Sequence, residues 1–135
     1  MPIELDHVAI AVRDVGEPLR VIVGELGSLV MHGGAAVGFR AMQIDCGACA
    51  IELLEPWNVE INDFLKRFLE RSGQGPHHLT FKTDDIEREL ARVEEAGYHP
   101  TGVNLGNPWW QEAFLHPKET GGVLIELCEL PKGHA

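Results

Sequence analysis

The chain repeats itself, and this repeat is the feature that most constrains its fold. His7 and Asp14 in the first half match His78 and Asp85 in the second half at the same interval. A second match pairs the segment 51–53, with the sequence Ile-Glu-Leu, with the identical segment at 125–127. A repeat of this length indicates two copies of one supersecondary unit that share a core.

Each half has the pattern of a strand, a helix and three further strands. Alternating or continuous apolar runs predict strands, and the helices are expected to begin at the capping residues Asp14, Asn58 and Asp84. Gly33 and Gly34 are expected to form a turn after a short strand. The predicted strands are 5–12, 28–31, 39–45, 49–55, 77–83, 98–101, 110–115 and 123–128.

The fold class that follows is α+β. Two tandem βαβββ modules, residues 1–72 and 73–135, are expected to form a curved, partly closed mixed sheet around a metal site, with the helices outside. The loop 72–76, which is rich in glycine and contains a proline, marks the boundary.

The first strand predicts which of its faces lies near a site. Successive side chains of a strand alternate between its two faces, so His7, Ala9 and Ala11 share one face. The larger residues at 8, 10 and 12 should pack on a helix, and the two alanines should leave room beside His7.

Two glutamates stand inside apolar strands. An unpaired ionised carboxylate in such a place costs several kcal/mol, so Glu52 and Glu126 should be protonated, paired or bound to a metal. A single glutamate of this kind is ambiguous, and a lone histidine is usually structural. Because His7, Glu52, His78 and Glu126 fall in matching frames of the repeat, a shared metal site is the better interpretation. Such a set suits Zn, Ni, Co, Mn or Fe. His77 competes with His78, and the repeat frame selects His78.

Composition excludes some functions. The chain has 135 residues, 44% of them hydrophobic, and a formal net charge of -10, which disfavours a nucleic-acid partner. It contains no run near the roughly 20 apolar residues that span a bilayer, so no membrane association is expected. The three cysteines do not suggest a disulfide framework, and no signal peptide is recognised, so a cytoplasmic protein is expected.

Four stretches resemble a known family: residues 5–12, 51–56, 75–81 and 113–126. They are similar to the vicinal oxygen chelate superfamily, which includes glyoxalase I, ring-cleaving dioxygenases and methylmalonyl-CoA epimerase. The match is best to the methylmalonyl-CoA epimerase branch, and with the intervening helices it covers nearly the whole chain.

The resemblance implies a ligand set and a reaction. Carried over to this sequence, the metal ligands are His7, Glu52, His78 and Glu126, and the cofactor is a divalent ion such as Co, Ni, Mn or Zn. The implied activity is that of a metal-dependent epimerase or isomerase that enolises an acyl-CoA-like acid, with Glu126 as a catalytic base as well as a ligand. The implied partners are a small-molecule substrate and a second copy of the chain in a homodimer.

One segment departs from the pattern of that branch. The family epimerases carry acidic residues between the second and third strands, and one of them is the proposed second base; residues 31–39 contain no carboxylate. His32 is the candidate substitute. Two alternatives therefore stay open: a glyoxalase I-like lyase and a non-catalytic small-molecule-binding protein. An extradiol dioxygenase uses two histidines and one carboxylate, so Glu52 argues against it.

Overall fold

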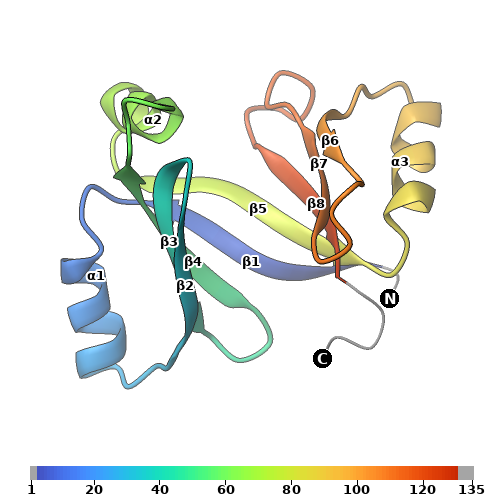
Figure 1. Ribbon diagram of the computed structural model, residues 1–135. Helices are drawn as coiled ribbons and strands as arrows, with labels where there is room; N and C mark the ends of the chain where they lie inside the picture. The colour runs from blue at the N-terminus through green and yellow to red at the C-terminus, as the bar shows by residue number, and fades with distance from the viewer. Residues whose placement is uncertain (1–2, 131–135) are drawn as a thin grey trace. The chain divides into compact units, whose positions relative to one another are not determined.

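The computed structural model describes residues 3–130 as a series of strands and helices (Figure 1). Their order is β1 (Ile3–Ala11), α1 (Gly16–Leu19), η1 (Arg20–Glu25), β2 (Val30–Ala36), β3 (Gly38–Asp45), β4 (Ala50–Trp57), α2 (Phe64–Ser72), β5 (Gly75–Thr83), α3 (Ile86–Glu95), β6 (Thr101–Asn104), β7 (Gln111–Leu115) and β8 (Ile125–Glu129). Within these residues, no helix has both the length and the apolar character needed to cross a bilayer.

The chain forms two compact units, each with the same strand pairing. The N-terminal unit comprises residues 7–77, and the C-terminal unit comprises residues 3–6 and 78–130 of the described chain. The strand order is β2-β3-β4-β1 in the first unit and β5-β8-β7-β6 in the second, in a mixed sheet. β1 pairs in parallel with β4, and β5 pairs in parallel with β8. The expected α+β class is confirmed, and in each unit the first and last strands lie side by side.

The division of the chain at residues 72 and 73 stays a prediction. β1 and β5 both run from one unit into the other, because the boundaries fall after Asp6 and after His77.

The core of the N-terminal unit lies between β1, β4 and α2. Ala9 and Ala11 are fully buried against Leu54 and against Leu65 and Leu69 of α2. The expectation that the larger residues of β1 pack on the helix while the alanines leave open room was wrong for this part of the strand. The small side chains instead let α2 approach the sheet closely, so the face that carries His7 is filled by α2 at one end.

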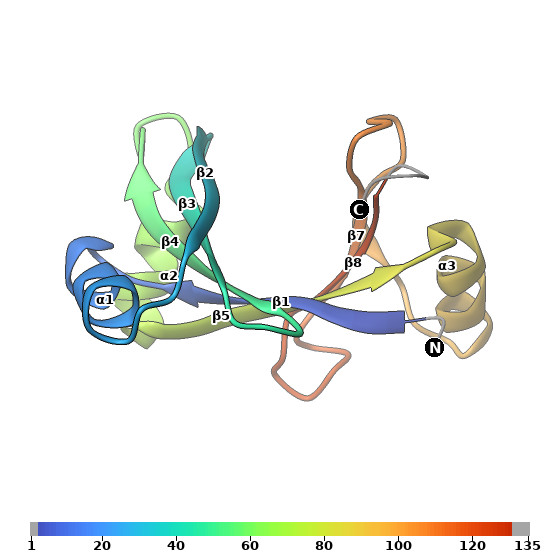
Figure 2. The same ribbon diagram turned by 90° about the horizontal axis from the view of Figure 1, so that it is seen from below.

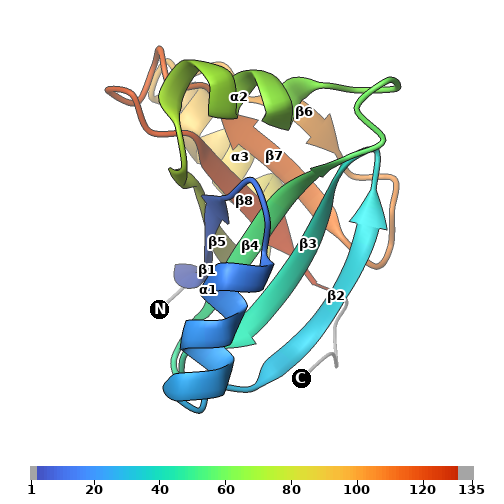
Figure 3. The same ribbon diagram turned by 90° about the vertical axis from the view of Figure 1, so that its left-hand side faces the viewer.

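The first helix differs from its expected form. Its N-cap is Val15, and the Asp14 side chain instead accepts a hydrogen bond from the Gly16 N–H. The second part, η1, is π-helical, with the Leu26 N–H bonded to the Val21 carbonyl oxygen at 2.9 Å. Figure 3 shows α1 and η1 as one continuous coil. In the sequence, an apolar stripe runs along this helix at positions 19, 22, 23 and 26. No residue of α1 or η1 is buried, so the helix contributes less to the core than this stripe predicts.

β2 extends through the two glycines that were expected to form a turn. Gly33 and Gly34 pair with Met42 and Ala41 of β3 in a regular antiparallel register. In Figure 2, β2 lies directly beside β3. The hairpin turns later, next to Gly38, whose φ of 93° belongs to the region that favours glycine.

The core of the C-terminal unit lies between the sheet and α3, which Figure 1 shows beside β6, β7 and β8. Ile86 and Leu90 of α3 are buried against Ala113 and Leu127. The cap of α3 is Asp85, whose side chain accepts the Arg88 N–H at 3.0 Å. Asp84, the cap expected from the sequence, pairs with the Arg88 guanidinium instead, at 2.5 Å.

Candidate metal centre

The N-terminal unit places His7 and Glu52 on one face of its sheet. Ala9 is the strand partner of Glu52, and His7 lies two residues before Ala9, so all three side chains point to the same side. His7 Nε2 lies 3.7 Å from Glu52 Oε1, and His7 is only 2% exposed. A separation of 3.7 Å is too long for a direct hydrogen bond.

Gln43 holds the other oxygen of Glu52. Its side-chain N–H donates to Glu52 Oε2 at 2.9 Å, from the directly opposite position on β3. Oε1 is therefore the Glu52 oxygen that faces His7. This is the arrangement expected of a metal-binding carboxylate that is oriented by a second residue.

The C-terminal unit contains the equivalent pair. Thr80 is the strand partner of Glu126, and His78 lies two residues before Thr80 on the same face of β5. His78 Nε2 lies 3.3 Å from Glu126 Oε1, and the Thr80 hydroxyl donates to that same oxygen at 2.8 Å. Glu126 is only 5% exposed, so its charge requires compensation by a polar or cationic neighbour.

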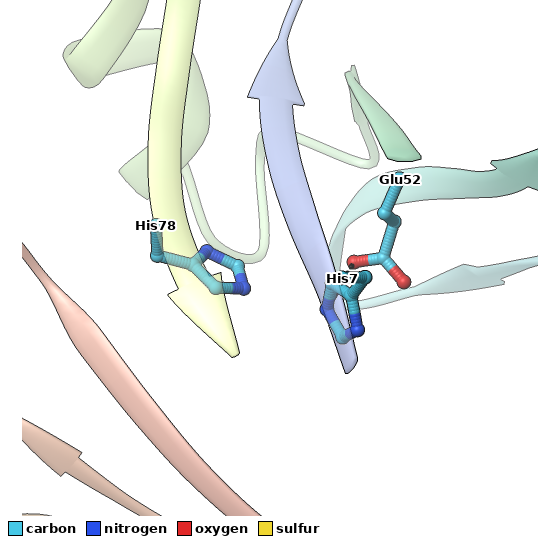
Figure 4. A group of neighbouring side chains, drawn as sticks. All are labelled: His7, Glu52 and His78. Carbon is cyan, nitrogen blue, oxygen red and sulfur yellow. Dashed lines mark ion pairs between the residues drawn. The ribbon is translucent and has the colours of Figure 1, made fainter. Parts of the chain in front are cut away.

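Each of these two His–Glu separations suits two ligands of one cation. Ligand atoms about 2.1 Å from a metal ion lie about 3 to 4 Å from one another. Within the N-terminal unit, Figure 4 shows the Glu52 carboxylate next to the His7 ring. Two imidazoles and carboxylates form a donor set typical of divalent transition metals.

His77, the competitor of His78, belongs to a different environment. Its ring centroid lies 4.7 Å from that of Phe68 and 6.1 Å from that of Phe64, both on α2. The alternation of β5 therefore directs His77 to the core of the N-terminal unit and His78 to Glu126.

Glu112 was not identified from the sequence. Its strand partner on β8 is Cys128, and Glu126 lies two residues before Cys128 on that strand. Because side chains two residues apart in a strand lie on the same face, Glu112 and Glu126 share a sheet face. The Trp110 indole N–H donates to Glu112 Oε2 at 3.1 Å. Burial, then a hydrogen bond with Glu126, raises the pKa of Glu112 to about 7. The signal that could have found it is the one used for Glu126, an acidic residue within a mainly apolar strand.

His32 lies at the end of a row of polar side chains across the N-terminal unit. It is the strand partner of Gln43, which in turn is the strand partner of Glu52. Directly opposed residues share a sheet face, so the three side chains follow one another across β2, β3 and β4. A cavity of about 230 Å³ is lined by His32, Gln43, Glu52 and the small residues of β2.

Glu55, the second glutamate of β4, has a structural environment. It is 5% exposed, forms an ion pair with Arg40, and accepts the Val15 N–H at 2.9 Å. These contacts tie the start of α1 to the sheet, on the face opposite Glu52 and Leu54.

Comparisons with known proteins identify relatives over nearly the whole chain. A family model described as the glyoxalase/bleomycin resistance protein/dioxygenase superfamily matches residues 6–114. An uncharacterized Bacillus subtilis protein, YqjC, is 32% identical over 96% of this chain and 93% of its own length. The ethylmalonyl-CoA/methylmalonyl-CoA epimerase of Cereibacter sphaeroides is 33% identical over 91% of this chain and 95% of its own length.

Solved structures agree with these relatives. A Streptomyces coelicolor methylmalonyl-CoA epimerase variant in complex with 2-nitronate-propionyl-CoA aligns with a TM-score of 0.82 and 27% identity. The alignment covers 98% of this chain and 97% of that one.

Proposed function

The chain belongs to the glyoxalase/bleomycin resistance protein/dioxygenase superfamily, and we propose that it is a metal-dependent epimerase acting on an acyl-CoA-like acid such as methylmalonyl-CoA. The observation that carries the proposal is the pair of equivalent His–Glu contacts, at 3.7 Å in one unit and 3.3 Å in the other. Relatives named as epimerases of such substrates support the choice of reaction.

The proposed ligands are His7, Glu52, His78 and Glu126, one histidine and one glutamate from each copy of the repeat. Their nitrogen and carboxylate donors fit a single divalent ion such as Co, Ni, Mn or Zn. When bound, that ion would supply Lewis-acid stabilisation of negative charge on the acyl oxygen.

Glu126 is the proposed first base. Its Oε1 is fixed by Thr80 and faces His78, so the carboxylate is held in one orientation before substrate binds. A base held in position next to the acidic C–H avoids the entropic cost of finding its geometry during the reaction. Glu126 removes the proton from the carbon beside the thioester, and an acid then returns a proton to that carbon.

Epimerisation requires a second proton-transfer group that reaches the carbon from the opposite face. Residues 31–39 contain no carboxylate, and His32 is the titratable side chain of that segment. His32 lines the same cavity as Glu52, and an imidazole side chain can both accept and donate a proton. We therefore assign the second role to His32.

Proton exchange with each epimer tests both assignments. The metal-loaded wild-type protein in D₂O should incorporate deuterium at the α-carbon of both epimers of methylmalonyl-CoA. His32→Gln should lose epimerisation, because one of the two bases is missing. It should also lose deuterium exchange with the epimer that His32 deprotonates, and keep exchange with the epimer that Glu126 deprotonates. Glu126→Gln cannot serve as the matching control, since it also removes a proposed ligand.

The outcomes separate the claims. If the metal-loaded wild-type protein exchanges neither epimer, the epimerase proposal is wrong. If His32→Gln exchanges both epimers at the wild-type rate, the epimerase proposal stands and His32 is not the second base.

A non-catalytic binding protein is the second candidate, because residues 31–39 lack the carboxylate that the epimerase branch carries. Such a protein would bind the acyl-CoA in a calorimetric titration but would show no exchange with either epimer and no turnover of a hemithioacetal. Turnover of the hemithioacetal alone would instead identify a glyoxalase I-like lyase.

A further inference from the structure

The turn between β3 and β4 carries two cysteines, Cys46 and Cys49, that the proposed function does not use. The ladder of these strands ends with Asp45 opposite Ala50, so the two cysteines are the next pair in the same register. Their backbones are still opposed, since the Cys46 N–H donates to the Cys49 carbonyl oxygen at 3.1 Å. Directly opposed residues of an antiparallel pair project to the same face, so both thiols leave the hairpin on one side.

The spacing of such a pair suits a bond between the two sulfur atoms. Opposed residues that share backbone hydrogen bonds have Cα atoms about 5.5 Å apart. Disulfides join residues whose Cα atoms are about 4.4 to 6.8 Å apart. A disulfide between Cys46 and Cys49 therefore needs rotation of the two side chains and a small adjustment of the turn, but no rearrangement of the strands.

The turn is held in shape from within and is open on its outside. The Asp45 carboxylate accepts the Gly47 N–H at 2.8 Å, and Gly47 has a φ of 89°, in the region that favours glycine. A Cβ added to Gly47 would meet no atom within 4 Å, so nothing in the described chain packs against this point of the turn. The space beside the turn lets a small molecule approach the thiols.

The thiols differ in their exposure. Cys46 is exposed and Cys49 is partly buried, whereas the third cysteine, Cys128, is fully buried in the C-terminal unit. Thiol–disulfide exchange requires access to the attacking sulfur. Cys46 is therefore placed to react first with a molecule from solvent, and Cys49 to react with Cys46 afterwards, while burial protects Cys128.

We propose that Cys46 and Cys49 form a redox-active pair that is oxidised to an intramolecular disulfide by exchange with a low-molecular-weight disulfide, RSSR. The Cys46 thiolate attacks one sulfur of RSSR, which forms a mixed disulfide and releases one RS⁻. The Cys49 thiolate then attacks the Cys46 sulfur, which forms the bond between the two cysteines and releases the second RS⁻.

This exchange balances. Two electrons pass from the protein to RSSR, and the two thiol protons pass to the released thiolates, which gives two RSH. Exposed disulfides are the readily reduced ones, so an excess of RSH runs the same steps in reverse and restores both thiols. Neither cysteine is a proposed metal ligand, so the proposal does not rest on the proposed function.

Equilibration of the full chain with glutathione tests the proposal. Fully reduced wild-type protein is incubated with oxidised glutathione, denatured and alkylated, and its mass is measured intact and after proteolysis. Of the three cysteines, only Cys128 should then carry an alkyl group, and one peptide should contain the disulfide between Cys46 and Cys49. Dithiothreitol should restore alkylation of all three.

Two variants separate the two steps, and a third is the matched control. Cys49→Ser keeps the first step and lacks the second, so it should accumulate one glutathione per chain on Cys46, which the wild type should not. Cys46→Ser lacks the exposed thiol and should take up glutathione more slowly than Cys49→Ser. Ala48→Ser changes an exposed residue of the same turn, keeps both thiols and should behave as the wild type.

The wild-type protein alone can overturn the proposal, so the test does not depend on the folding of any variant. Three alkylated cysteines in an excess of oxidised glutathione would overturn it, and so would a stable mixed disulfide on Cys46. A disulfide between two chains, seen as a dimer on a non-reducing gel, would overturn it as well.

Discussion

At the scale of single residues, the alternation of the strands determines which side chains meet. His7 and His78 reach their glutamates because each lies two positions before the strand partner of the glutamate. These two pairs could be expected from the repeat alone. Glu112 could not, because its proximity to Glu126 depends on the register of β7 against β8, which no local pattern fixes.

Gln43 gives a prediction at this scale. Gln43→Leu removes the donor that holds Glu52 Oε2, so metal affinity should fall about 10- to 100-fold with little change in the melting temperature. Calorimetric titration with Co²⁺ measures the metal affinity. Gln74→Leu is the matched control, since Gln74 accepts only from the exposed Arg13 N–H among the contacts that the structure gives. Equal affinities of the two variants would contradict the role of Gln43.

Glu112 predicts a pH dependence of stability in the metal-free protein. Burial, then the hydrogen bond with Glu126, raises its pKa to about 7, whereas an unfolded chain ionises the same group near about 4.3. Between these values the folded state binds a proton that the unfolded state has lost, so the free energy of unfolding falls as pH rises. Because Glu112 is only partly buried, solvent screening reduces the effect, and the loss should be about 1 to 2 kcal/mol.

Urea unfolding at several pH values measures this effect. The difference between wild type and Glu112→Gln isolates Glu112, since the amide does not titrate and all other carboxyl groups are shared. The wild type should lose stability relative to Glu112→Gln between about pH 4.5 and 7.5. Parallel curves for the two proteins over that range would show that the Glu112 pKa is not raised.

At the scale of elements, the strands and the later helices follow from the sequence better than the first helix and β2 do. β4 is apolar from Ala50 to Leu54 except for Glu52, and the apolar residues Ile86 and Leu90 of α3 are buried. A strand was predicted at 28–31, but its extension to Ala36 was not, because glycine is a poor strand former and only the pairing with β3 makes Gly33 and Gly34 extended. The apolar stripe of the first helix predicts burial, but the structure buries none of its residues.

The hairpin of β2 and β3 gives a prediction at this scale. Gly38 has a φ of 93°, and a Cβ there would lie 2.7 Å from the Asn62 carbonyl oxygen. Gly38→Ala should therefore cost about 2 to 3 kcal/mol, because it combines backbone strain with a steric clash. Gly34→Ala should change stability by no more than about 0.5 kcal/mol, since a Cβ there meets no atom within 4 Å.

Urea unfolding of the two glycine variants checks this. A Gly38→Ala protein as stable as Gly34→Ala would mean that the hairpin does not turn at Gly38. The comparison is matched because both substitutions add one methyl group to the same hairpin.

At the scale of the whole molecule, the repeat in the sequence corresponds to two units with the same parallel pairing of first and last strands. This is why matching frames in the sequence identify a His–Glu pair in each unit. Sequence alone does not fix where the units divide, because β1 and β5 run through both of them. The central proposal is that the two pairs hold one cation together.

The metal stoichiometry of the purified protein tests that proposal most directly. Elemental analysis and calorimetry of wild type, His7→Ala and His78→Ala should give one Co²⁺ per chain in the wild type and no tight binding in either variant. No bound ion, two ions per chain, or binding that depends on only one of the two histidines would contradict a single centre built from both pairs.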